Sequence, residues 1–352
     1  MFRIGTGLAL IGFLVLPVSA QAPTPAAKYR IQEGFPPDEI SRLQHRTSNL
    51  RKGFQAFDSE SVQSVILKSR VWNPQEQPLT VAFLGGSVDL REKIVSTVGA
   101  WSSAANIKFD FGTPGAFREW ATTDRAYKAD IRIAFDEKGY WSFVGSDSID
   151  PSVTGPGQAS MNFQDFTQSL PDDWEGVVLH EFGHAIGFEH EHQSPGGNCD
   201  AEFRYQDDAG YVATKDMYGS FVQDSQGRRP GIYTVLGGPP NNWSSQQVDF
   251  NLRQLSNTTD LRFSAFDVKS IMMYSFQSWM FVNGDQSSCY TPENQNLSQQ
   301  DQRAALETYP RDVNAAISTA IRNFSALQTL ATQSRLSQDI KAQAQSRIQK
   351  MQ

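Results

Sequence analysis

Three of the five histidines in this chain lie close together, with a glutamate and a glycine between them. His180 and His184 are four residues apart, so on an α-helix their side chains lie on one face and can bind one metal ion. Glu181 follows the first histidine, where its carboxylate can reach a metal-bound water without being a ligand. His190 cannot reach the metal from the same straight helix, but Gly187 tolerates positive φ and lets the chain turn back. This spacing predicts a zinc site with three histidine ligands.

Three protein ligands leave the fourth coordination position of zinc for water, which is the arrangement of a catalytic site. A closed structural site needs a fourth protein ligand, and His192 and Cys199 are the nearby candidates. The glutamate beside the first ligand favours catalysis. We therefore expect zinc to lower the pKa of its water and to polarise a peptide carbonyl. Glu181 is expected to take the proton from the water and pass it to the leaving amine.

A second motif lies further along the chain, in segment 270–274, which reads Ser-Ile-Met-Met-Tyr. Together with the histidine segment, it resembles the metzincin clan of zinc endopeptidases, and the astacin family most closely. The resemblance implies that Met272 forms an apolar floor beneath the zinc and that Tyr274 binds the metal or the transition state. Glu191, directly after the third histidine, is also similar to astacins, because matrixins carry serine there.

The resemblance implies an α+β fold of the metzincin, or zincin-like, class. Such a domain has a twisted mixed sheet, an active-site helix above a zinc cleft, and an irregular lower lobe, here expected over 196–269. It also implies that segment 129–135 is the edge strand for extended substrate, because an open sheet edge offers unpaired N–H and C=O groups to a peptide. The residues expected to pair with substrate are Asp130, Ile131, Arg132, Ile133 and Ala134. Segment 139–145 is expected to form a rim of the cleft.

The apolar pattern predicts the elements that must position these residues. Strands are predicted over 79–84, 107–111, 129–135 and 158–163. Apolar residues recur at helical spacing from Leu90 to Trp101, which predicts an amphipathic helix ending near residue 105. The zinc-binding helix is predicted to start near Trp174, with Asp172 or Asp173 as its cap. Segment 297–310 is predicted as the last helix of the catalytic domain.

The chain is divided by its composition into four parts. Residues 1–20 combine an early arginine, a short apolar run and small residues before a cleavage site, which is typical of a secretory signal peptide. The other parts are a leader or propeptide-like segment (21–67), the metzincin catalytic domain (68–310) and a C-terminal helical tail (311–352). One or two short helices are expected in the second half of the leader.

A propeptide could silence the zinc in more than one way. Matrixins use a propeptide cysteine, and no cysteine precedes Cys199, which excludes that mechanism. Astacins use a propeptide aspartate. Asp58 or Asp38 could correspond to it, although a solvated loop aspartate is the simpler interpretation.

Composition and charge agree with an exported protein. Cys199 and Cys289 are expected to form a disulfide in an oxidising compartment, with two free thiols as the alternative. The formal net charge of −7 argues against nucleic acid as a partner. No segment after the signal peptide is apolar over the length that spans a bilayer, so no integral membrane segment is predicted. We expect the mature protein to be secreted.

The sequence therefore predicts a secreted zinc endopeptidase acting on extended protein or peptide substrates. One alternative is a secreted binding or adhesion protein with a vestigial zinc site, against which the intact Glu181 argues. The other is an interaction protein that acts through its C-terminal helix. For the tail over 311–352, docking on the domain is favoured, and self-association or a bound partner remain alternatives.

Overall fold

The computed structural model describes residues 34–54, 68–239, 241–255 and 265–351. The predicted signal peptide, much of the leader and Asp58 lie outside these residues. No helix within the described ranges is long and apolar enough to cross a lipid bilayer.

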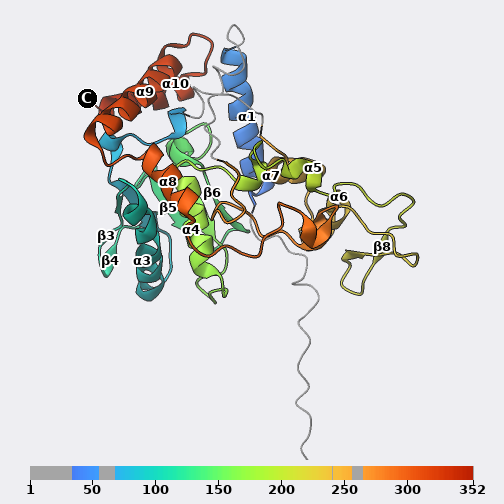
Figure 1. Ribbon diagram of the computed structural model, residues 1–352. Coiled ribbons are helices and arrows are strands. Elements are labelled where there is room, and N and C mark those ends of the chain that lie inside the picture. The colour runs from blue at the N-terminus through green and yellow to red at the C-terminus, as the bar shows by residue number, and fades with distance from the viewer. Residues whose placement is uncertain (1–33, 55–67, 240, 256–264, 352) are drawn as a thin grey trace, which may run out of the picture.

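Strands and helices alternate up to the zinc-binding helix, after which helices dominate (Figure 1). The longer helices and the strands of the main sheet are α1 (Pro37–Gly53), β1 (Leu79–Phe83), α3 (Val88–Ala104), β2 (Phe109–Asp110), β5 (Ile131–Ala134), β6 (Tyr140–Ser142), β7 (Met161–Phe163), α4 (Trp174–Ala185), α6 (Ile232–Gly237), α7 (Ser245–Leu252), α8 (Gln299–Thr308), α9 (Val313–Thr332) and α10 (Gln338–Lys350). The shorter elements are β3 (Gly112–Thr113), β4 (Ala116–Phe117), α5 (Cys199–Glu202), β8 (Thr214–Lys215), β9 (Phe221–Val222) and the 3₁₀ turns η2 (Pro74–Glu76), η3 (Gly145–Ile149), η4 (Glu191–Gln193), η5 (Ser278–Met280) and η6 (Gly284–Gln286).

A five-stranded sheet in the order β2-β1-β5-β7-β6 forms the upper lobe. Its strands are parallel except β6, which runs antiparallel to β7. The apolar face predicted for α3 is buried in one core with the sheet and α4. Trp101 of α3 also donates from Nε1 to the carbonyl oxygen of Leu179 in α4, at 2.9 Å. These contacts hold the helix that carries the histidine motif against the sheet.

The strand expected to bind substrate is not an edge strand. β5 pairs with β1 on one side and β7 on the other, so the edge-strand prediction was wrong. It had named Asp130, Ile131, Arg132, Ile133 and Ala134. Arg132 is buried, and its guanidinium donates to the carbonyl oxygens of Gln158 and Ser148, at 2.9 and 2.7 Å. In an alternating strand pattern, a charged residue usually marks a position that faces solvent. Here the hydrogen-bond donors of Arg132 find buried carbonyl acceptors instead. The edge strand that contacts α4 is β6.

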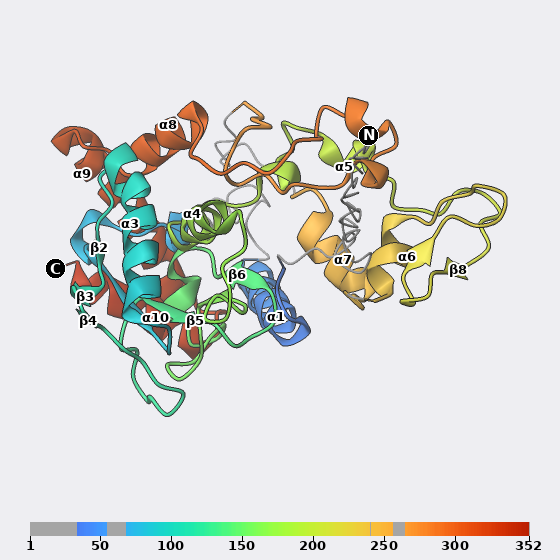
Figure 2. The same cartoon turned by 90° about the horizontal axis from the view of Figure 1, so that it is seen from below.

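The lower lobe is irregular, as expected, and has its own apolar core. That core encloses the disulfide between Cys199 and Cys289, which joins α5 to the segment after η6. Met273 and Tyr274, which follow the methionine of the second motif, also belong to it. Figure 2 shows α5, α6 and α7 on one side of α4 and α3 with β2 on the other. The histidine motif therefore lies between two separately packed lobes.

The two ends of the described chain pack on the upper lobe and on each other. α9 and α10 form a helical hairpin, so the tail docks as two helices (Figure 1). Leu50 of α1 and Phe54, the C-cap residue of this helix, are buried with Leu327 and Leu330 of that hairpin. At its other end, α1 buries Leu43 in a core with residues of β5 and β6. The leader thus contains a docked helix.

Candidate active site

The three histidines of the motif converge on one point. Nε2 of His184 lies 3.0 Å from Nε2 of His180 and 3.0 Å from Nε2 of His190. The ligand atoms of all three lie within 4.8 Å of one another. His180 and His184 reach this point from one face of α4, whereas His190 reaches it from the loop beyond the helix.

The other ring nitrogens show that these residues fit a zinc ion. Each Nδ1 faces an oxygen: Ile271 O at 2.6 Å from His180, Phe188 O at 2.7 Å from His184, and Gln193 Oε1 at 3.1 Å from His190. An amide oxygen only accepts hydrogen bonds, so each Nδ1 carries the proton and each Nε2 directs a lone pair inward. Lone pairs that converge in this way repel one another unless a cation lies between them. Three neutral imidazoles are a ligand set that suits zinc.

The candidates for a fourth protein ligand are used elsewhere. Cys199 is in the disulfide, and Nε2 of His192 lies 2.9 Å from the carbonyl oxygen of Asn251. The donor set is therefore the three-histidine set of a catalytic site, which leaves one coordination position for water.

Gly187 makes the turn that brings the third histidine back. α4 ends at Ala185, and Gly187 has a φ of 106°, which favours glycine over residues with a Cβ. Its N–H donates to the carbonyl oxygen of His184 at 2.8 Å, which closes the helix end. The chain then reverses and places the His190 ring beside the two rings on the helix.

The methionine turn packs against this motif from below. Met272 is buried against Gly183 of α4, where a Cβ would overlap its sulfur atom. Its carbonyl oxygen accepts the N–H of Glu191 at 2.9 Å. Glu181 is 1% exposed and lies next to His180 on α4. The structure thus places the predicted acid and the predicted methionine floor at the three-histidine site.

Tyr274 and Glu191 flank the histidines. The centroid of the Tyr274 ring lies 4.3 Å from that of His190 and 5.7 Å from that of His180. The carboxylate of Glu191 accepts the N–H of Asp267 at 2.9 Å. Burial raises the pKa of Glu191 to about 7, against the opposing effect of that hydrogen bond. Glu191 therefore links the histidine segment to the loop that leads into the methionine turn.

Gln193 supports the third histidine, a role that the sequence did not reveal. Its Oε1 faces Nδ1 of His190, while its Nε2 donates to the carbonyl oxygens of Phe250 and Arg253, both at 3.0 Å. One amide side chain thus orients the ligand and ties it to the end of α7. The sequence offered no local signal for this, because the partners lie in the lower lobe.

Asp301 supports the first histidine through the methionine turn. Its carboxylate accepts the N–H of Ile271 at 2.8 Å and the hydroxyl of Ser270 at 2.6 Å. The carbonyl oxygen of the same Ile271 faces Nδ1 of His180. Asp301 also forms a capping box with Ser298, the N-cap residue of α8, so the same carboxylate serves the start of this helix and the methionine turn.

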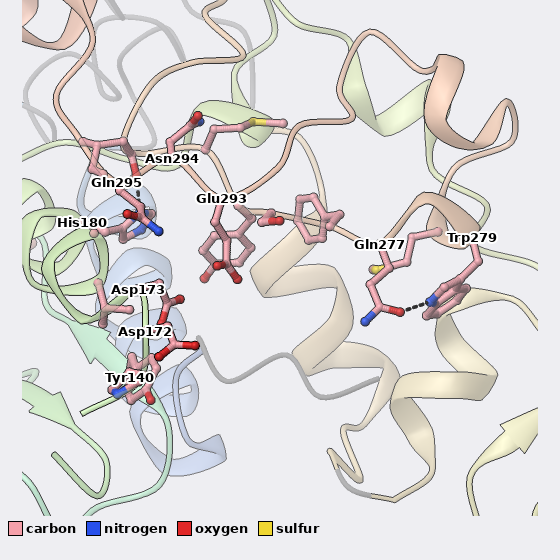
Figure 3. Close-up of a pocket in the computed structure, with 18 of the residues that line it drawn as sticks. Tyr140, Asp172, Asp173, His180, Gln277, Trp279, Glu293, Asn294 and Gln295 are labelled. Carbon is pink, nitrogen blue, oxygen red and sulfur yellow. Dashed lines mark hydrogen bonds between the residues drawn. The ribbon is translucent and has the colours of Figure 1, made fainter. Parts of the chain in front are cut away.

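A cavity of about 550 Å³ opens beside His180 (Figure 3). Tyr140 of β6, the first turn of α4 and the segment after Tyr274 line it. Figure 3 shows Asp172, Asp173 and Glu293 directed toward the same space, and no lysine or arginine is among its lining residues. Burial, the charge of Asp173 and a hydrogen bond with Asp173 raise the pKa of Glu293. Asp173 is the N-cap residue of α4, which is one of the two positions predicted, but its side chain makes no capping hydrogen bond.

A second cavity, of about 680 Å³, opens on the other side of the ligands. His184 and His190 lie in its wall, together with Glu189 and Gln193. The opposite wall is formed by one face of α1, including Leu43 and Thr47. The leader helix therefore borders the space next to the zinc ligands.

No protein-family model matches the chain, and no curated protein matches it. Among solved structures, the chain is similar to myroilysin, with 29% identity, a TM-score of 0.51, and coverage of 70% of this chain and 98% of that chain. A second myroilysin structure shows 26% identity and a TM-score of 0.42 over 69% and 87% of the two chains. A hatching-enzyme zinc-protease of the medaka fish Oryzias latipes, high choriolytic enzyme 1, shows 15% identity and a TM-score of 0.38 over 68% and 94%.

The first similarity and the three-histidine site together decide the class of the protein. The fold is that of an astacin-like zinc metalloendopeptidase. The resemblance and the fold class predicted from the sequence are confirmed, and so is one catalytic zinc with His180, His184 and His190 as its ligand set. As a protease of this class, the chain acts on peptide substrates.

Proposed function

We propose that this astacin-like protease is secreted and hydrolyses extended protein or peptide substrates, with Glu181 as the general base. The observation that carries the proposal is the shared helix. α4 presents two zinc ligands and a buried carboxylate side by side, with the third ligand turned back onto them. A buried site strengthens electrostatic interactions with the reacting groups, because little water screens them.

Each of these side chains has a defined part in hydrolysis. Zinc, when bound, acts as a Lewis acid that lowers the pKa of a water molecule and polarises the scissile carbonyl. Glu181 accepts the proton of that water and then delivers it to the leaving amine. Tyr274 donates a hydrogen bond to the substrate oxygen as it becomes negative, a role supported by its packing on His190 and His180. The oxygens of Ile271, Phe188 and Gln193 accept from Nδ1 of the imidazoles, which fixes the tautomer and the orientation of each ring.

We assign extended substrate to β6. This strand lies at an edge of the sheet and contacts α4, and Tyr140 at its start lines the cavity beside His180. An extended peptide can add to such an edge through main-chain hydrogen bonds, while its side chains enter the flanking cavities. β5 has partners on both sides and offers no such edge.

We also propose that the leader keeps the enzyme latent. The N–H of Gly34 donates to the carbonyl oxygen of Tyr140 at 3.1 Å, which is an acceptor that substrate would use on β6. The ring of Phe35 packs on Phe143 of the upper lobe and Phe250 of α7, with centroids 5.4 and 6.1 Å apart. This contact bridges the two lobes across the site.

The division of the chain follows from this proposal. The signal peptide (1–20) directs export, and the disulfide suits an oxidising compartment. Removal of the leader (21–67) then opens the second cavity, because α1 forms its outer wall. The catalytic domain (68–310) and the tail (311–352) remain.

Replacement of Glu181 by glutamine tests the catalytic assignment. The variant should keep its zinc and lose hydrolysis by about 100- to 10,000-fold, the usual contribution of a general base. Glu175→Gln is the matched control, since this glutamate is exposed on the first turn of the same helix. Hydrolysis of a quenched fluorescent peptide is measured for both, with and without a chelator, beside zinc content. Wild-type turnover in Glu181→Gln, or turnover that survives full removal of zinc, would contradict the proposal.

A further inference from the structure

An arginine in the last turn of the C-terminal hairpin is buried against the catalytic domain. Arg347 of α10 is 1% exposed. Its guanidinium pairs with both carboxylate oxygens of Glu76, at 2.7 and 2.8 Å. It also donates to the carbonyl oxygens of Ser69 and, at 2.9 Å, Val71, and to the hydroxyl of Ser146 at 2.6 Å. A guanidinium so deeply buried is tolerated because its donors have partners.

The two carbonyl groups define what this arginine holds. They belong to residues 69 and 71, on either side of Arg70, so one planar group fixes the path of that short stretch of main chain. The guanidinium carbon also lies 5.4 Å from the ring centroid of Trp72. Arg347 therefore orients the residues that carry the Arg70 and Trp72 side chains.

The side chains of Trp72 and Arg70 contact the two ends of the loop between α4 and His190. Trp72 donates from Nε1 to the carbonyl oxygen of Ala185 at 2.9 Å, at the end of α4 and next to His184. Arg70 pairs with Glu189 at 2.9 Å, and Glu189 directly precedes His190. Between these contacts, Val71 is the residue that a Cβ on Gly187 would meet first. The stretch 69–72 thus covers the whole turn that brings the third ligand to the metal.

We propose that Arg347 is a positioning residue of the zinc site, which acts through Trp72 and Arg70 on the loop that presents His190. The inference rests on the proposed function of this site. It gives the C-terminal hairpin a role inside the catalytic unit. Loss of the guanidinium loosens stretch 69–72, and the loop over Gly187 then samples positions in which His190 leaves the metal.

The test uses the full-length, zinc-loaded chain and a readout independent of turnover. Zinc release to a chromogenic chelator is timed for Arg347→Met, Arg347→Lys and Trp72→Phe. Lys341→Met is the matched control, because within the described residues this cation of α10 donates only to the carbonyl oxygen of Ser334, in the hairpin itself. Circular dichroism confirms that each variant is folded, and kcat and KM are measured on one peptide.

We expect Arg347→Met to release zinc about 10- to 100-fold faster, as other supports of metal ligands do when removed. Its kcat should fall while KM changes little, because the substrate-binding edge on β6 is untouched. Arg347→Lys should recover part of the loss, and Lys341→Met should match wild type. Trp72→Phe should also release zinc faster. The effect of combining Arg347→Met with Trp72→Phe on zinc release should be smaller than the sum of the two single effects, since both residues act on one loop.

Wild-type zinc release and kcat in a folded Arg347→Met would overturn the inference. If that variant does not fold, Trp72→Phe decides, and unchanged zinc release in it has the same consequence. Failure of the proposed function can be told apart from failure of this inference. If the wild-type chain hydrolysed no peptide, the zinc-release rates of wild type and Arg347→Met could still be compared.

Discussion

Replacing Arg46 by methionine should release α1 from the catalytic domain and raise the activity of the unprocessed chain. Arg46 is 2% exposed and pairs with Asp150 at 2.5 Å and with Asp147 at 3.2 Å. Both carboxylates lie at η3 and are themselves buried, and Asp147 is among the residues that line the second cavity. Methionine keeps much of the aliphatic stem but removes the charge, so packing of Leu43 and Leu50 on either side is preserved.

The loss of docking free energy depends on the partners that Asp147 and Asp150 keep when Arg46 is replaced. Breaking a buried ion pair by removing one partner costs about 3–5 kcal/mol, because the other charge stays buried. Asp147 keeps Arg70, at 2.9 Å, and Asp150 keeps hydrogen bonds from the N–H and hydroxyl of Ser152. We therefore expect the lower value, about 3 kcal/mol, which shifts the docking equilibrium of α1 by roughly two orders of magnitude.

The same ion pair determines how docking depends on pH. Burial alone would raise the pKa of Asp150, but the charge of Arg46 and hydrogen bonds from Ser152 and Arg46 lower it overall. A carboxyl group with a lowered pKa stabilises the docked state above its unperturbed pKa, and this stabilisation is lost as pH falls through the docked value. In the wild-type chain, α1 should therefore loosen only below about pH 4. In Arg46→Met this acid step should be smaller.

Two measurements check the prediction. Limited proteolysis reports whether α1 is docked, and the initial rate on a fluorescent peptide reports whether the cleft is open. Arg51→Met is the control, because it removes the same charge from an exposed position on the same helix. Unchanged protease resistance in Arg46→Met would refute the energetic reasoning. If α1 became sensitive to protease but the rate of peptide hydrolysis did not rise, docking of α1 would not be what keeps the enzyme latent.

Two further predictions concern the lower lobe and the cavity beside His180. Replacing Cys199 and Cys289 by serine opens a link across 90 residues, and loop entropy predicts a loss of about 4–5 kcal/mol of unfolding free energy, measured by denaturant titration. The acidic lining of the cavity beside His180 predicts that the enzyme prefers lysine over glutamate beside the scissile bond. The double substitution Asp173→Asn and Glu293→Gln should lower this preference by roughly tenfold, as expected for loss of a partly screened charge contact. Cleavage of a peptide set measures that ratio. An unchanged ratio would rule out an electrostatic role for this cavity.

The elements that depend on local pattern are predictable from the sequence. The helix lined by Leu90 to Trp101 and the zinc helix from Trp174 match α3 and α4, because spacing along one helix reports which face is buried. The histidine motif is predictable for the same reason, since two ligands on adjacent turns and a glycine turn are all local. The disulfide was predictable because the chain has two cysteines and the sequence predicts export to an oxidising compartment.

Strand order and the residues that support the ligands were not predictable in this way. An alternating pattern does not say how many neighbours a strand has, and it does not mark the carbonyl groups of Gln158 and Ser148 that accept from buried Arg132. Gln193 and Asp301 act through main-chain groups of other segments. Backbone carbonyl groups are present at every residue, so the sequence holds no signal that marks the ones in use.

Residues 69–72 are where both ends of the chain act on the zinc site. Arg46 of α1 and Arg70 share Asp147, whereas Arg347 holds the main chain on both sides of Arg70. Loss of the leader would therefore leave Asp147 paired with Arg70 and would not touch the contacts of Arg347. The hairpin that carries Arg347 shares an apolar core with Leu50 and Phe54 at the end of α1. The proposed removal of the leader would therefore uncover part of the hairpin as well as the second cavity, while the polar contacts of Arg347 with stretch 69–72 remain.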